Sequence, residues 1–212
     1  MSGRLIIFDL DGTLVDSKPD LTRSVNHVRN QFGLPSLTEE AIAGMIGDGA
    51  GMLVKRALGG SVSDERARAG LEEFLSYYRE HMLDETRLYP GVAETLDALS
   101  GCDLAVLTNK PWRFSCQILE GLGIYGRFTA VYGGNSFSGK KPDPVGVRQI
   151  LSDTGAGPGA TWMVGDSSVD VLTGRNAGVR TCGVTYGYAA HTFEQHPPDV
   201  LIDRFGELMG VV

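Results

Sequence analysis

The chain has 212 residues, and its 19 lysines and arginines against 26 aspartates and glutamates give a formal net charge of −7. A nucleic-acid-binding domain usually carries a basic excess or a basic stripe, so nucleic acid is not expected as a partner. Hydrophobic residues make up 42% of the sequence and charged residues 21%, which excludes a wholly disordered chain. The 29 glycines follow no fixed period, so collagen-like and low-complexity structures are excluded as well.

The length allows one large domain, or a domain with an insertion, to fold around its own core without disulfides. The cysteines Cys102, Cys116 and Cys182 are odd in number and widely spaced, so we interpret them as reduced thiols. Only a short apolar run precedes Asp9, too short for a signal peptide or a membrane span. The sequence therefore predicts a cytoplasmic protein with no membrane partner.

The first expected element is a strand over residues 5–8, where Leu-Ile-Ile-Phe forms a continuous apolar run that ends at Asp9. Such a run is typical of a strand buried on both faces of a sheet. No comparable run occurs between residues 17 and 85, where apolar residues recur with helical spacing instead. A helical insertion is therefore expected after the first strand.

Start signals for helices occur at three places in this insertion. Ser17, Thr38 and Ser63 each stand shortly before acidic residues, a pattern that favours a helix N-terminus. The last of these helices carries an apolar stripe that we expect to lie in a core, formed by Leu71, Phe74, Leu75, Tyr78 and Met82.

Three further apolar runs predict buried strands, over residues 104–107, 130–132 and 161–164. Pro111, the pair Pro142 and Pro144, and Ser167 then stand where helices can begin, and the helix from Ser167 is expected to run toward Gly178. Strand, turn and helix in this order indicate a parallel sheet with right-handed crossovers and helices on both faces.

The predicted fold class is α/β, with a Rossmann-like, doubly wound parallel sheet as the core and a small α-helical cap domain inserted into it. The predicted core covers residues 1–16 and 86–212, and the predicted cap covers residues 17–85.

Polar residues stand at the ends of the predicted strands, where ligands bind in open α/β sheets. They are Asp9, Asp11, Thr13, Thr108, Asn109, Lys141, Asp166 and Asp170. Clustered carboxylates repel one another by about 1–4 kcal/mol per close pair unless a cation lies among them. Carboxylate oxygens suit a small dication, so we predict Mg²⁺ as the cofactor, with Asp9, Asp11 and Asp166 as its ligands.

These residues resemble the motifs of the haloacid dehalogenase-like hydrolase superfamily. The motifs stand in the family's order and are Asp9-Leu-Asp-Gly-Thr13, Thr108, Lys141 before Pro142, and Gly165-Asp166-Ser-Ser-Val-Asp170. The helical insertion also lies where that family has its small cap. Finer features resemble phosphoglycolate phosphatases, namely Ile46-Gly-Asp-Gly49 with Arg56-Ala-Leu58, Thr108-Asn-Lys-Pro111 and Thr185-Tyr-Gly-Tyr188. The resemblance implies a phosphatase that acts on a small phosphate monoester, with 2-phosphoglycolate as the first candidate.

The resemblance also implies catalytic roles for the aspartates. Asp9 would attack phosphorus and form an aspartyl phosphate, which suits a carboxylate because it is already ionised at neutral pH. Asp11 would protonate the leaving alkoxide and then take a proton from the water that hydrolyses the intermediate. Asp166 would bind the metal, while Asp170, one helical turn further on, would orient Lys141 or metal-bound water.

Three residues are expected at the phosphoryl group. Thr108 and Asn109 lie at a strand end, where a hydroxyl, an amide and free backbone N–H groups can hold phosphoryl oxygens. Lys141 offers a positive charge to the same group. Lys140 competes for this role, and Lys141 is preferred because the family's lysine directly precedes a proline.

In the cap, Arg56 is predicted to bind substrate as a bidentate clamp on a small carboxylate. Asp48 stands where asparagine is expected in the phosphoglycolate subfamily, and its negative charge would oppose an anionic substrate. The four histidines lack metal-ligand spacing and are interpreted as surface or packed residues.

Other functions fit part of this pattern. A sugar phosphomutase of the same superfamily shares the two-aspartate motif but returns the phosphate to its substrate. A phospho-acceptor signalling module also places carboxylates, a hydroxyl and a lysine at the end of a parallel sheet, although it lacks the Asp9-x-Asp11 pair and the cap. A dehalogenase is disfavoured, because halide displacement does not need the acid that Asp11 supplies. The expected partner is a small phosphorylated metabolite, and the sequence leaves the oligomeric state open.

Overall fold

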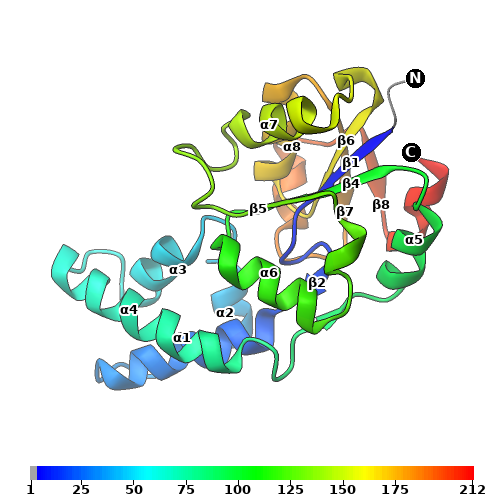
Figure 1. The fold of residues 1–212 in the computed structure, drawn as a ribbon. Coiled ribbons are helices and arrows are strands. Elements are labelled where there is room, and N and C mark those ends of the chain that lie inside the picture. The colour runs from blue at the N-terminus through cyan, green and yellow to red at the C-terminus, as the bar shows by residue number, and fades with distance from the viewer. Residues whose placement is uncertain (1–3) are drawn as a thin grey trace.

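The computed structural model describes residues 4–212, so residues 1–3 of the predicted core segment lie outside the described residues. At its centre is a six-stranded parallel sheet in the order β5-β4-β1-β6-β7-β8 (Figure 1). Its strands are β1 (Leu5–Phe8), β4 (Asp103–Leu107), β5 (Ala130–Tyr132), β6 (Thr161–Gly165), β7 (Arg180–Val184) and β8 (Val200–Ile202).

Helices cover both faces of this sheet, which confirms the predicted doubly wound α/β fold class. They are α5 (Val92–Ala98), α6 (Trp112–Gly121), α7 (Val145–Thr154) and α8 (Ser168–Ala177). Short 3₁₀ turns complete the region, at Tyr125–Arg127, Pro158–Ala160, Ala190–Glu194 and Phe205–Gly210. Within residues 4–212, none of the helices combines the length and the apolar character that a membrane span requires.

β1 lies in the middle of the sheet, and all four of its residues are completely buried. Ile6 and Phe8 face the layer that contains α5 and α6. Leu5 and Ile7 face the opposite layer, which contains α7 and α8. Burial on both faces explains why the sequence of β1 is a continuous apolar run instead of an alternating one.

The four predicted strands are all present, and each lies within one residue of its expected bounds. Ser167 and Gly178 also cap the two ends of α8, as predicted, with Gly178 in the left-handed conformation. The sequence did not predict β7 and β8. β7 contains Arg180 and Gly183, which interrupt its apolar run, and β8 is a three-residue strand at the sheet edge.

All secondary-structure elements within residues 17–85, the predicted insertion, are helices. We call this segment the cap. Its helices are α1 (Lys18–Gln31), α2 (Glu39–Ala43), α3 (Ala50–Ala57) and α4 (Asp64–His81). They stand to one side of the sheet (Figure 1). A two-stranded antiparallel ribbon flanks them, made of β2 (Val15–Asp16) and β3 (Arg87–Leu88).

Two of the three predicted helix starts have the predicted side-chain cap. Thr38 and Ser63 cap α2 and α4, because the side chain of each accepts a backbone N–H three residues on. Ser17 precedes α1, but its hydroxyl donates to Asp11 instead of capping the helix. The predicted apolar stripe of α4 faces inward, with Phe74, Tyr78 and Met82 buried.

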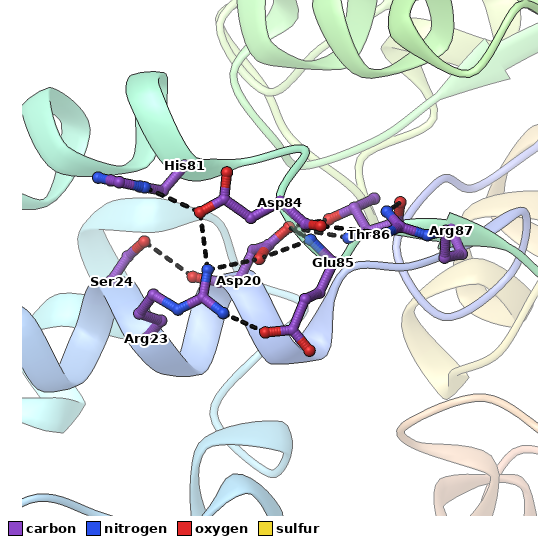
Figure 2. Close-up of polar contacts among 8 residues, drawn as sticks. All are labelled: Asp20, Arg23, Ser24, His81, Asp84, Glu85, Thr86 and Arg87. Atoms are coloured by element: carbon purple, nitrogen blue, oxygen red, sulfur yellow. Dashed lines mark hydrogen bonds and ion pairs between the residues drawn. The ribbon is translucent and has the colours of Figure 1, made fainter.

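Asp20, in the first turn of α1, joins the two segments that connect the cap to the sheet region. Its fully buried carboxylate accepts the backbone N–H of Glu85 at 3.0 Å and both the N–H and the hydroxyl of Thr86 at 2.8 Å (Figure 2). Arg23 pairs with Asp84 and Glu85 on the more exposed side of this cluster. Since α1 follows β2 and Thr86 precedes β3, one carboxylate holds the entry and the exit of the cap together.

We expect Asp20→Ala to lower the free energy of unfolding by roughly 2–4 kcal/mol, because it leaves buried N–H groups without an acceptor. Thr86→Val removes only the hydroxyl and should cost about 1 kcal/mol. Urea unfolding followed by circular dichroism measures both. A loss below about 0.5 kcal/mol for Asp20→Ala, the range of ordinary surface substitutions, would contradict this assignment.

Candidate active site

A cavity lies between the carboxyl edge of the sheet and the cap. Its walls contain residues that follow β1, β4 and β6 together with cap residues from α3, α4 and the loop before α3. They include Asp9, Asp11, Thr108, Asn109, Lys110, Lys141, Asp166, Ile46, Leu53, Phe74 and Tyr78. The chain places β4 on one side of β1 and β6 on the other, and ligand crevices in open α/β sheets form at such a switch point.

Lys141 is buried between two carboxylates. Its Nζ lies 2.8 Å from a carboxylate oxygen of Asp9 and 2.6 Å from one of Asp170. Burial opposes the charge of this lysine, but Asp170 and Asp9 outweigh that effect and raise its pKa. Lys141 is therefore a fixed positive charge at neutral pH, whereas its neighbour Lys140 is exposed.

Asp166 is held at the end of β6 by the backbone. Its Oδ2 accepts the N–H of Tyr188 at 2.7 Å and that of Ala189 at 3.3 Å. Gly12 packs directly against this carboxylate with φ of +82°, so a side chain at that position would both strain the backbone and collide with Asp166. Steric contact with Asp166 thus explains why the residue after Asp11 is a glycine.

Three carboxylates meet in this part of the cavity. One oxygen from each of Asp9, Asp166 and Asp170 lies within 4.8 Å of the others. Burial, Asp170 and Asp9 raise the pKa of Asp166 well above its usual value. Burial also raises the pKa of Asp9 to about 6, against the opposing effect of Lys141. Closely spaced, poorly solvated carboxylate oxygens are a donor set that fits a hard dication, and the metal dependence predicted from the sequence agrees with this set.

The members of this cluster differ from the predicted ligands at one position. Asp11 was predicted beside Asp9 and Asp166, but its carboxylate turns toward Lys110 and Ser17, and Asp170 takes its place in the cluster. The reason is charge, because Lys110 is a buried ammonium that Asp11 neutralises. Asp170 in turn pairs with Lys141, the contact expected of a residue that orients this lysine.

Lys110 is the principal site residue that sequence reasoning missed. Its Nζ lies 3.0 and 3.1 Å from the two carboxylate oxygens of Asp11 and donates to the hydroxyl of Tyr78 at 2.8 Å. Burial opposes its charge, but Asp11 outweighs this effect and its pKa is raised. Burial raises the pKa of Tyr78 to about 12, so the phenol stays protonated at neutral pH. The sequence feature that could have identified Lys110 is its position two residues after Thr108, close to the same strand end.

Thr108 and Asn109, predicted from the sequence to contact the phosphoryl group, are buried and lie on the cavity wall. The amide of Asn109, however, is engaged by the protein. It donates to the carbonyls of Gly47 in the cap and Lys141, at 2.9 and 3.1 Å, and it accepts the N–H of Lys141 at 3.0 Å. The structure therefore gives this side chain a positioning contact with Lys141 and with the cap.

The structure does not bring Arg56 to the described cavity wall, although a substrate contact was predicted for it. Its guanidinium donates to the Asp48 carboxylate and to the carbonyl of Met45 at 3.1 Å. This half-exposed ion pair neutralises Asp48 as well, so the charge that seemed to oppose an anionic substrate is already compensated.

Comparison with known proteins defines the class of protein to which this fold and site belong. Residues 6–184 match the family described as Haloacid dehalogenase-like hydrolase. The chain belongs to the haloacid dehalogenase-like hydrolase family.

Relatives over almost the full length carry more specific names. A protein named Phosphoglycolate phosphatase from Agrobacterium fabrum is 41% identical over 210 residues, which cover 96% of this chain and 90% of that protein. Phosphoglycolate phosphatase 1 from Pseudomonas aeruginosa is 39% identical over 97% of this chain and 78% of its own length. A crystal structure of a predicted phosphoglycolate phosphatase from Haemophilus somnus has a TM-score of 0.94 and 35% identity, covering 100% of this chain and 98% of that one.

These relatives confirm two predictions made from the sequence. The chain is a hydrolase of the predicted superfamily, similar to phosphoglycolate phosphatases, and its enzyme class is a phosphoric monoester hydrolase. Membership in this family leaves the signalling-module alternative without support.

Lys141→Met should reduce kcat for phosphate-ester hydrolysis by roughly 10²–10³-fold, because it removes the buried charge that we expect to face the phosphoryl group. Lys140→Met is a matched control that removes the same charge from an exposed neighbour, and we expect less than about a twofold change. Steady-state phosphate release at fixed substrate measures both variants. Equal losses in the two variants would show that Lys141 has no special role.

Proposed function

We propose that this enzyme hydrolyses 2-phosphoglycolate to glycolate and phosphate, with Mg²⁺ as its metal. The observation that carries the proposal is the pair Asp9 and Asp11, which both lie on the wall of the same cavity, each with its own buried lysine. The names of relatives that align over nearly the whole chain support the choice of substrate. The free cysteines of the structure suit a reducing compartment and support the predicted cytoplasmic location.

In the first chemical step, Asp9 attacks phosphorus and the bond from phosphorus to the ester oxygen breaks. Lys141, 2.8 Å from the Asp9 carboxylate, holds this nucleophile and offsets the charge of the phosphoryl group. Asp11 enters this step in its protonated form, donates its proton to the departing oxygen and is left as a carboxylate, so that glycolate leaves as an alcohol. The products of this step are an aspartyl phosphate at Asp9 and free glycolate.

The second step restores the enzyme. A water molecule attacks the phosphorus of the aspartyl phosphate, Asp11 takes the proton of that water, and phosphate leaves as the Asp9 carboxylate is released. Lys110 and Ser17 hold Asp11 in place for both proton transfers. The cap residues Phe74 and Leu53 line the cavity and limit the access of bulk water.

Asp9 and Asp166 are the residues that we propose to hold Mg²⁺, with Asp170 beside them in the same cluster. When bound, Mg²⁺ supplies positive charge that offsets the repulsion between these carboxylates and a phosphate dianion. The sequence-based set also included Asp11, which this structure pairs with Lys110.

Asp9→Asn should lower phosphate release from 2-phosphoglycolate by about 10³-fold or more, because an amide is not a nucleophile toward phosphorus. The change is nearly isosteric, so the variant should remain folded, which circular dichroism can verify. Retention of full activity would remove Asp9 as the nucleophile.

The substrate is tested by comparing kcat/KM for a panel of phosphate monoesters with the wild-type enzyme and Mg²⁺. We expect 2-phosphoglycolate to lead the panel and the phosphoryl group to appear as inorganic phosphate. Return of the phosphoryl group to a sugar phosphate would favour the phosphomutase alternative. A preference for an unrelated monoester would reject 2-phosphoglycolate but keep the phosphatase.

Removal of metal with EDTA should abolish turnover, and added Mg²⁺ should restore it. Mg²⁺ should also raise the free energy of unfolding, by about 2.7 kcal/mol at a concentration of 100 Kd, because it binds the folded carboxylate cluster. Asp166→Asn should remove most of this stabilisation. Thermal unfolding with and without Mg²⁺ reads out binding without depending on turnover, and an unchanged stabilisation in the variant would exclude Asp166 as a ligand.

A further inference from the structure

We infer that Lys110 and Tyr78 together form the recognition site for the carboxylate of the leaving group, so that the enzyme selects phosphate esters whose alcohol carries an anionic group. This inference rests on the proposed function and names the groups that would set its specificity. Lys110 follows the strand end of β4, whereas Tyr78 belongs to helix α4 of the cap. The site would therefore be complete only where the cap meets the sheet region.

The cavity has two cationic residues on its described wall, within residues 4–212, and they differ in what they contact. Lys141 lies between Asp9 and Asp170, at the nucleophile and the carboxylate cluster. Lys110 lies beside Asp11, the residue that protonates the leaving oxygen. The two lysines are thus divided between the phosphoryl side and the leaving-group side of the reaction.

Tyr78 adds a second donor next to Lys110. An ammonium group can only donate, so the Tyr78 oxygen accepts the 2.8 Å hydrogen bond from Lys110. The phenolic proton is then left without an acceptor in the part of the chain that the structure describes, although Tyr78 is only 1% exposed and lines the cavity. A buried hydroxyl that lacks an acceptor favours a ligand that supplies one.

The surroundings fix the direction of these donors. The Tyr78 ring stacks on Phe74 with centroids 5.4 Å apart and meets Phe114 edge-on at 5.5 Å. Lys110 lies over the same ring, 4.7 Å from its centroid. These apolar rings lower the polarity around Lys110 and Tyr78. A substrate carboxylate that replaces water there would therefore make stronger hydrogen bonds to the two residues than it makes in bulk water.

The predicted carboxylate clamp, Arg56, is not available for this task, since Asp48 already pairs with it outside the described cavity wall. Lys110 has the geometry to serve. It contacts both oxygens of Asp11 at nearly equal distances, so one N–H can serve both oxygens and free a second one for the substrate. The ammonium would then bridge Asp11 and the substrate carboxylate.

The test compares two substrates that differ only in this group, 2-phosphoglycolate and 2-hydroxyethyl phosphate, in which CH₂OH replaces the carboxylate. Lys110→Met should lower kcat/KM on both substrates, because Lys110 also holds Asp11. The loss on 2-phosphoglycolate should exceed the loss on 2-hydroxyethyl phosphate by a further factor of roughly 10–100, because only 2-phosphoglycolate loses its carboxylate contact. Tyr78→Phe should lower kcat/KM for 2-phosphoglycolate by about 3–10-fold and leave 2-hydroxyethyl phosphate nearly unchanged. Lys140→Met, which removes an exposed lysine, is the control and should not alter the ratio of the two substrates.

Equal losses on both substrates would overturn the inference, since they would mean that Lys110 acts only through Asp11 and makes no contact with the substrate carboxylate. An unchanged ratio in Tyr78→Phe would remove Tyr78 from the site, and this variant keeps the test valid if Lys110→Met does not fold. Turnover of the two substrates by the wild-type enzyme tests the proposed function separately. Turnover of neither substrate by the wild type would reject the proposed substrate class, whereas turnover with an unaltered ratio in the variants rejects only this inference.

Discussion

The ion pairs of Lys141 with Asp9 and Asp170 are the interaction on which the rest of the site depends. A buried ammonium between two carboxylates is stable only while both partners remain, and removal of one member of such a buried group typically costs about 3–5 kcal/mol. Asp170 also accepts from the backbone and hydroxyl of Ser167, which fixes the first turn of α8. The lysine therefore links the end of β1 to the start of α8, and Asp166 lies on the short segment between β6 and that helix.

Charge explains why the site takes this form. When all four are ionised, Asp9, Asp11, Asp166 and Asp170 carry four negative charges, and the buried residues Lys110 and Lys141 return two positive ones. A dication completes neutrality, so an anionic phosphate meets a site without excess negative charge. The net charge of −7 for the whole chain would by itself oppose the binding of such a substrate. The charges inside the cavity, and not the net charge of the chain, decide whether an anionic substrate can bind, because charges in a cavity are screened far less than surface charges.

Some of the fold and the site could be predicted from the sequence because the information is local. β1 is a buried run followed at once by Asp9, and α8 is bounded by its own cap residues, Ser167 and Gly178. The sequence did not show which side chains the fold brings into contact. Arg56 was assigned to the substrate because a guanidinium can clamp a small carboxylate. Spacing alone could not show that it pairs with Asp48, eight residues earlier in the sequence. Tyr78 satisfied the apolar periodicity of α4, which hid the fact that its hydroxyl reaches the cavity.

The contacts between the cap and the sheet region are distributed unevenly. At the linkers, Asp20 alone accepts several hydrogen bonds from Glu85 and Thr86, and the two from Thr86 are buried. At the cavity, single hydrogen bonds span the boundary, from Lys110 to Tyr78 and from Asn109 to Gly47. Each exchanged hydrogen bond contributes only about 1 kcal/mol, so the polar contacts hold the cap firmly at its linkers and weakly over the cavity. These weak contacts are made by Lys110, which pairs with Asp11, and by Asn109, which contacts Lys141. A ligand in the cavity would therefore compete with the cap for hydrogen bonds close to the proposed catalytic residues.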